Sequence, residues 1–244
     1  MIIATGTDIG KKRRENQDSF AISPVGEKAY AAVLCDGMGG AAGGKTASSL
    51  AAEHFIGFIK KNYRDGMDAD ECVSLITGAI NEANAVVYSL SLKKSSLSGM
   101  GTTLVAALIC EDRVHVANIG DSRLYEITDG NIKQITNDHT YVRYLLNIGE
   151  INIDEMATSP FRHMITRAVG TRETEEADFF ELERKGQTLL LCSDGCYGSI
   201  PSALMASTVR SGSYAELENS VKELIDLANG RDGSDNITAI AIRL

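Results

Sequence analysis

The sequence lacks any apolar run of the length that a membrane-spanning helix needs, about 20 residues. No secretory signal opens the chain, which starts directly with the apolar segment Ile2-Ile3-Ala4. Cysteine is scarce: there are five, an odd number, and most lie in apolar runs. Such cysteines suggest buried thiols in a reducing compartment and not a disulfide framework. We therefore expect a cytoplasmic protein with no membrane attachment.

A basic excess is also missing. The chain has 24 lysines and arginines against 33 aspartates and glutamates, which gives a formal net charge of -9. Because a nucleic-acid-binding surface needs a basic face, we expect no nucleic-acid partner. The acidic excess could bind divalent cations or simply keep the protein soluble. Cys192 and Cys196 lack the paired spacing of a zinc site, which argues against zinc there.

Apolar periodicity predicts strands and helices that follow one another without an internal linker. Strands at both ends of the 244 residues, with helices between them, predict a single α+β domain. Residues 148–164 have no clear periodicity, so we expect a mobile surface loop there. The predicted strands are 2–9, 19–23, 30–35, 101–109, 113–119, 122–128, 131–135, 178–183, 188–192 and 237–242, and the predicted helices are 45–61, 69–92, 140–147, 201–209 and 214–229.

Several carboxylates stand where an apolar strand begins or ends. Asp36 follows the run that starts at Tyr30, Asp194 follows a second such run, and Asp235 precedes the last strand. Asp18 and Asp121 also lie close to strand ends. An Asp-Gly pair is often just a turn. If these strand ends meet, however, the converging like charges need protons or cations to offset them. Oxygen ligands without His or Cys favour magnesium or manganese over zinc, which gives the hypothesis of a two-metal hydrolase.

The chain resembles a known family through eight motifs that occur in order from residue 13 to residue 238. The resemblance is to the metal-dependent Ser/Thr protein phosphatases of the PPM, or type 2C, class in their compact bacterial form. The motifs are Arg13-x-x-Asn16-Gln17-Asp18, Asp36-Gly37-Met38-Gly39-Gly40, Gly101-Thr102-Thr103, Gly120-Asp121-Ser122-Arg123, Asp138-His139, Ile165-Thr166-Arg167-Ala168-Val169-Gly170, Ser193-Asp194-Gly195 and Asp235-Asn236-Ile237-Thr238.

The resemblance implies a single-domain, four-layer α-β-β-α sandwich with two central, mainly antiparallel sheets. Residues 1–244 would form one phosphatase domain, with a flap subdomain at about 140–170. The implied activity is hydrolysis of phosphoserine and phosphothreonine in proteins, opposing a cognate Ser/Thr kinase. We expect the protein to act as a monomer on phosphorylated proteins.

The resemblance also implies a set of metal ligands for Mn²⁺ or Mg²⁺. Asp36 would bridge two ions, and the carbonyl group of Gly37 would bind one of them. Asp194 and Asp235 would complete the shell of the other ion. Asp121, together with Asp194, would hold a third ion more loosely.

Two further residues would take part in the reaction itself. Asp18 would hold metal-bound water, and Arg13 would bind the substrate phosphate, to which a planar guanidinium is well suited. A hydroxide bridging the two ions would attack phosphorus in line, so Arg13 and Asp36 are the predicted catalytic residues.

The sequence departs from the family pattern beside this site. Ala41 stands where relatives often have His, and Lys45 where they often have Glu. The group that protonates the leaving oxygen is therefore open, with metal-bound water as the first choice. His139 is predicted to be structural, and neither His115 nor His163 is assigned the role of acid.

Two other functions stay open. One is a non-catalytic relative that binds phosphoproteins, which the presence of Asp36, Asp194 and Asp235 disfavours. The other is a phosphatase of small phosphoesters, which nothing in the sequence excludes.

Overall fold

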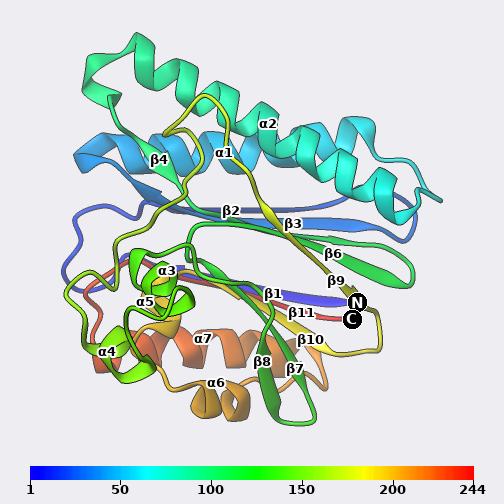
Figure 1. Ribbon diagram of the computed structural model, residues 1–244. Coiled ribbons are helices and arrows are strands. Elements are labelled where there is room, and N and C mark those ends of the chain that lie inside the picture. Colours follow the sequence, from blue (N-terminus) through cyan, green and yellow to red (C-terminus); the bar gives the residue numbers. More distant parts are fainter.

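Two β-sheets lie face to face in the middle of the molecule, and helices cover both outer faces (Figure 1). The structure, a computed structural model, describes residues 1–39, 43–156 and 158–244. The first sheet has the strand order β1 (Ile2–Asp8), β11 (Ile237–Arg243), β10 (Thr188–Cys192), β7 (Arg123–Thr128) and β8 (Asn131–Gln134). The second has the order β2 (Asp18–Pro24), β3 (Tyr30–Met38), β5 (Leu104–Ile109), β6 (Arg113–Ile119) and β9 (Asp178–Glu183), and β4 (Gly101–Thr102) also pairs with β3.

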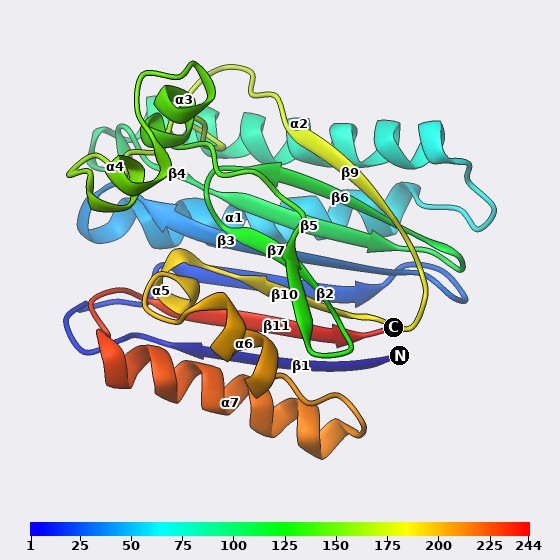
Figure 2. The same ribbon diagram turned by 60° about the horizontal axis from the view of Figure 1, so that its bottom comes forward.

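The helices divide between the two outer faces. Figure 2 shows α1 (Gly40–Asn62) and α2 (Ala69–Lys93) on the second sheet and α7 (Tyr214–Arg231) on the first. The short helices α5 (Asp194–Tyr197) and α6 (Ser202–Thr208) join α7, whereas α3 (Tyr141–Asn147) and α4 (Ile153–Thr158) lie at one end of the sandwich. One 3₁₀ turn, η1 (Ser95–Leu97), follows α2.

The alternation of side chains along β3 explains why the second sheet is covered on both of its faces. Val33 and Cys35 pack with α1 and α2, whereas Ala32 and Leu34 pack between the sheets against residues such as Ile240. A strand that faces apolar neighbours on both sides reads as a continuous apolar run, as the sequence predicted. The predicted four-layer α-β-β-α sandwich is therefore confirmed, and every named strand pair is antiparallel.

Three local expectations were incomplete. The strand predicted at 101–109 is interrupted at Thr103, which bonds to the backbone of Asp36 and so leaves the regular ladder. The loop predicted at 148–164 contains α4, which begins with a capping box between Asn152 and Glu155. The turn after β10 forms the short helix α5, which was not predicted.

Among the helices of the described residues, none has the length and apolar character required to cross a membrane.

Candidate metal centre

The predicted site residues come together at the end of the sandwich where α3, α4 and α5 lie, away from the two chain termini (Figure 1). All of them except Asp18, which lies opposite Asp36 in the strand pair, line a hollow of about 780 Å³ between the ends of the two sheets. Its lining includes Arg13, Gln17, Asp36, Gly37, Thr103, Asp121, His163, Asp194, Asp235 and Asn236.

Asp18 on β2 lies directly opposite Asp36 on β3 in the antiparallel register. Opposite residues of an antiparallel pair project from the same face of the sheet, so both carboxylates point toward the other sheet. One oxygen of Asp18 accepts hydrogen bonds from Ser193 Oγ at 2.8 Å and Thr238 Oγ1 at 2.6 Å. Ser193 follows β10 and Thr238 is on β11, so both hydroxyls belong to the first sheet. Asp18 thereby joins the two sheets beside the hollow.

The backbone of Asp36 is fixed by the Gly101-Thr102-Thr103 motif. Its N–H donates to Thr103 Oγ1 at 2.9 Å, and its carbonyl accepts from Thr102 Oγ1 at 2.8 Å and from the Thr103 N–H at 2.9 Å. Thr103 Oγ1 also shares a 2.7 Å hydrogen bond with Ser122 Oγ. This motif therefore positions Asp36, a role that the sequence did not indicate.

Asp194 and Asp235 come from chain segments that touch at Gly195 and Asn236. A Cβ atom on Gly195 would lie 2.1 Å from the carbonyl oxygen of Asn236, so only glycine permits this approach. Asn236 accepts from the Gln17 N–H at 2.8 Å and donates to the carbonyl of Glu15 at 3.0 Å. It thereby ties the loop of Arg13 to the start of β11. Asn236 was part of a family motif, but its positioning role was missed because it depends on contacts between distant segments.

Asp121 is supported from behind by a charged and aromatic group. Arg123 binds both carboxylate oxygens of Asp138, at 2.8 and 2.6 Å, and its guanidinium lies 3.7 Å from the ring centroid of Tyr197. Tyr197 in turn donates from its hydroxyl to the carbonyl of Asp121 at 2.8 Å. The family motifs around Asp121 and Asp138 thus position the loop between β6 and β7. Of these residues, only Asp121 faces the hollow.

His139 makes contacts of the structural kind that was predicted. Its Nδ1 accepts from the Gly120 N–H at 3.1 Å, and its Nε2 lies 3.2 Å from Asp178. His163 is placed differently, because its Nδ1 lies 3.9 Å from Oδ2 of Asp194 and the residue lines the hollow. His163 therefore lies beside the site, which its position in the sequence alone did not show.

The convergence of carboxylates changes their protonation. Burial raises the pKa of Asp18 to about 6, and the pKa of Asp121 to about 8, with the charge of Asp194 contributing to both. Burial likewise raises the pKa of Asp36 and of Asp194, and the neighbouring charges of Asp18 on Asp36 and of Asp235 on Asp194 raise them further. A protein without bound cations would keep protons among these groups at neutral pH.

The residues fit a site for hard divalent cations. Oδ1 of Asp18 and Oδ1 of Asp194 are buried and have no hydrogen-bond partner among the described residues. A buried carboxylate oxygen without a donor is costly, and a cation would satisfy it. The candidate ligands are all oxygen atoms, as magnesium and manganese prefer. The two unpartnered oxygens and the raised pKa values of the four buried aspartates both favour cation binding here.

Two departures from the family pattern have different outcomes. Ala41 lies outside the described residues. Lys45 donates from Nζ to the carbonyl of Asp18 at 3.0 Å and to Ser19 Oγ at 3.2 Å. It lines a separate hollow of about 590 Å³ and so supports β2 from the helix side.

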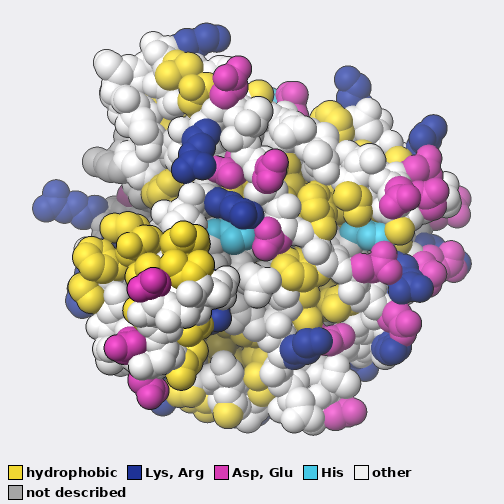
Figure 3. Space-filling model, viewed as in Figure 1, with side chains coloured by type: hydrophobic (Ala, Val, Ile, Leu, Met, Phe, Trp, Pro, Cys, Tyr) yellow, Lys and Arg dark blue, Asp and Glu magenta, His cyan; other side chains and the backbone are white. Residues whose placement is uncertain are grey.

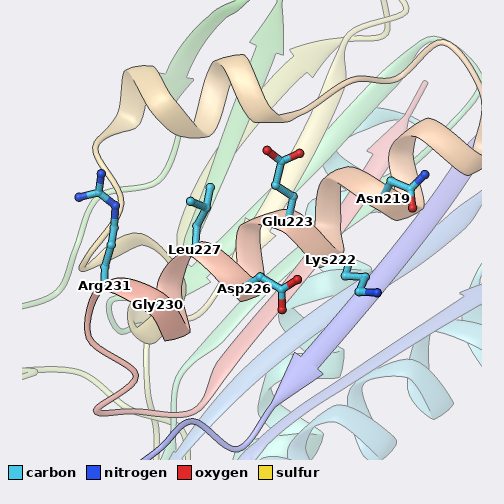
Figure 4. Close-up of a pocket in the computed structure, with 7 residues that line it drawn as sticks. All are labelled: Asn219, Lys222, Glu223, Asp226, Leu227, Gly230 and Arg231. Carbon is cyan, nitrogen blue, oxygen red and sulfur yellow. The ribbon is translucent and has the colours of Figure 1, made fainter.

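A hollow of about 420 Å³ on the outer face of α7 does not share this chemistry (Figure 4). Its side chains carry charges of both signs, including Lys222, Glu223 and Asp226, and Figure 4 shows them projecting in different directions from the helix. Such a mixed surface is typical of a solvated helix face.

The fold and the carboxylate set are those expected of a metal-dependent phosphatase. Residues 5–234 match the family Protein phosphatase 2C, and the chain belongs to this family of metal-dependent phosphatases. It is 33% identical over 237 residues to the serine/threonine phosphatase Stp of Listeria innocua, a match that covers 97% of this chain and 93% of the relative.

Solved structures agree with this assignment. The serine/threonine phosphatase Stp1 of Staphylococcus aureus has a TM-score of 0.91 and 31% identity, covering 100% of this chain and 95% of that one. The Mycobacterium tuberculosis serine/threonine phosphatase PstP/Ppp has a TM-score of 0.87 and 32% identity, covering 99% and 97% of the two chains.

Proposed function

We propose that this protein hydrolyses phosphoserine and phosphothreonine in proteins, with Mn²⁺ or Mg²⁺ bound by the carboxylates of the hollow. The observation that carries the proposal is the convergence of four aspartates from separate elements in one hollow beside an arginine, with Asp18 paired directly opposite one of them. Membership of the Protein phosphatase 2C family supports the reaction class.

The ligand roles follow from the position of each carboxylate. Asp36 has the charges of Asp18, Asp194, Asp121 and Asp235 around it, so it is the residue best placed to bridge two ions. The backbone carbonyl of Gly37 would contribute to one of them. Asp194 and Asp235 would complete the other, and Asp121 with Asp194 would hold a third.

Bound cations would lower the pKa of water and offset charge on the phosphoryl group. The side chains of the protein would orient the water and bind the phosphoryl group. Asp18, fixed by two hydroxyl donors, would accept a hydrogen bond from water in the site. Arg13, half exposed at the rim, would bind the phosphoryl oxygens and hold phosphorus in line for attack.

The flap, residues 140–170, would contact the polypeptide around the phosphorylated residue. Figure 3 shows hydrophobic side chains gathered over α3 and α4. The exposed members of this group are Tyr141, Tyr144, Ile148, Ile153, Phe161 and Met164. An exposed apolar surface beside a catalytic hollow is suited to protein substrates more than to small phosphoesters, which have no side chains to place there.

The chain would act as one phosphatase domain, residues 1–244, in the cytoplasm as a monomer, and would oppose a Ser/Thr kinase. The experiment that tests the function measures phosphate release from phosphoserine and phosphothreonine peptides. We expect activity with added Mn²⁺ or Mg²⁺ and its loss in excess chelator. Full activity of metal-stripped protein in chelator would contradict the proposal. Activity on small aryl phosphates alone would favour the alternative of a small-phosphoester phosphatase.

A further inference from the structure

Two cysteines and a histidine lie together at the opposite end of the sandwich from the metal centre. Cys72 is in the first turn of α2, Cys110 follows β5, and His115 is on β6. Figure 1 shows the start of α2 and the turn between β5 and β6 at the end away from α3, α4 and α5. The three ligand atoms, two sulfurs and a ring nitrogen, all lie within 4.8 Å of one another.

We propose that Cys72, Cys110 and His115 bind one Zn²⁺ ion, with water in the fourth position, and so join the start of α2 to the β5–β6 hairpin. A zinc–sulfur bond of about 2.3 Å places tetrahedral sulfurs roughly 3.8 Å apart. The three ligand atoms are therefore within a small side-chain adjustment of that geometry. Three protein ligands and a water are a known arrangement for this ion.

The donor types set the choice of cation. Thiolate and imidazole ligands select zinc and other thiophilic cations, whereas the carboxylates of the metal centre select magnesium or manganese. The sites at the two ends of the sandwich therefore prefer different kinds of metal ion. Two thiolates, a neutral imidazole and a divalent cation sum to zero net charge, which suits a place where Cys72 and His115 are buried.

The surroundings of the three residues favour this binding. Oε2 of Glu181 lies 3.6 Å from Nδ1 of His115. In metal sites a carboxylate beside one ring nitrogen orients the other nitrogen toward the metal. The hydroxyl of Tyr63 donates to Sγ of Cys110 at 3.9 Å, which would steady a thiolate there. Cys110 is half-buried, so the ion can enter from the surface.

The protonation states of the three ligands determine how many protons the binding step releases. Burial raises the pKa of Cys72 to about 12 and raises the pKa of Cys110, so both thiols carry protons when no cation is bound. Burial also lowers the pKa of His115, which keeps the imidazole neutral near pH 7. Binding of Zn²⁺ would form two zinc–sulfur bonds and one zinc–nitrogen bond and release two protons to solvent.

The test uses Co²⁺ as a spectroscopic substitute for Zn²⁺ in the full-length, reduced protein without oxygen. Cobalt bound to thiolate has charge-transfer absorption that cobalt bound only to carboxylates cannot produce. We expect this absorption to saturate at one equivalent and to disappear when Zn²⁺ is added. It should be lost in Cys72→Ser and Cys110→Ser and retained in Cys192→Ser, which removes a buried thiol elsewhere.

The Asp36→Asn variant separates this site from the proposed catalytic site. It should retain the thiolate absorption whether or not the protein is a phosphatase. In that variant Zn²⁺ should raise the melting temperature, and the rise should be absent in Asp36→Asn combined with Cys110→Ser. No thiolate absorption in excess Co²⁺ would overturn the proposal. So would absorption that persists in both cysteine variants, or a Cys72–Cys110 disulfide in protein that takes up no metal.

Discussion

Nη2 of Arg13 lies 2.6 Å from Oδ2 of Asp235. One partner is the predicted phosphate-binding residue, and the other is a predicted metal ligand. The hydrogen bond to Asp235 raises the pKa of Arg13 above its ordinary value. Because both side chains are partly exposed, this ion pair contributes little to stability. A cation on Asp235 would compete with the guanidinium, which would then turn to the phosphate.

The Arg13→Ala variant should raise the KM for a phosphopeptide roughly 10- to 100-fold, the equivalent of a lost charge-assisted hydrogen bond. The value of kcat should fall less, because Arg13 mainly binds phosphate before the reaction. Steady-state kinetics on one phosphopeptide measure both values. Lys12→Ala is the matched control, since Lys12 is in the same loop but pairs with exposed Asp232. An unchanged KM in Arg13→Ala would mean that the phosphate is bound elsewhere.

The stability of the metal-free protein should fall as pH rises from about 4 to about 8. The pKa of Asp18 is raised to about 6 and that of Asp121 to about 8 in the folded protein. Carboxyls with a raised folded pKa stay protonated while the unfolded chain ionises. Their contribution is therefore complete below the unfolded pKa and is lost as pH rises through the folded values. Bound Mn²⁺ would replace those protons, so its stabilising effect should grow with pH.

Melting temperatures in chelator and in Mn²⁺, measured across this pH range, test the expectation. The Asp121→Asn variant should lose less stability above about pH 6, because it removes the group with pKa about 8. Equal melting temperatures for the chelated protein throughout the range would contradict the raised pKa values.

Much of the fold was predictable because the apolar periodicity of each helix or strand can be recognised within its own stretch of sequence. Strand β6 has the predicted bounds, and α2 differs from its prediction by one residue. The grouping of Asp36 and Asp194 was also predictable, since each follows an apolar run. What the sequence could not supply is contact between distant segments. The bonds of Thr103 to Asp36, and the approach of Cys72 to Cys110, depend on packing that no local spacing records.

Replacing residues 151–159 with a short Gly-Ser linker should impair phosphopeptide hydrolysis more than hydrolysis of a small aryl phosphate. The replaced segment contains α4, and its exposed Ile153 belongs to the apolar surface of the flap. Binding energy from remote parts of a substrate is separable from chemistry at the reacting centre. We expect about a tenfold loss of kcat/KM for the peptide and a loss below about twofold for the aryl phosphate.

Paired assays on the two substrates distinguish the outcomes. Equal losses would indicate a defect in folding or in the metal centre. No loss on either substrate would make the segment a spacer, and substrate selection would then lie outside it.

Asp36 is the proposed bridging ligand, and its replacement by Asn shows whether metal binding and catalysis both depend on it. The change keeps the shape of the side chain and removes a charge that burial and Asp18 disfavour, so the metal-free variant should fold normally. Asp129→Asn is the matched control, since Asp129 is in the exposed turn between β7 and β8. Both variants are assayed for phosphopeptide hydrolysis and for Mn²⁺ bound per chain. We predict that Asp36→Asn loses about a thousandfold or more in kcat/KM together with its Mn²⁺, while Asp129→Asn keeps both. Near-normal turnover by Asp36→Asn would contradict the assignment of Asp36 as the bridging ligand.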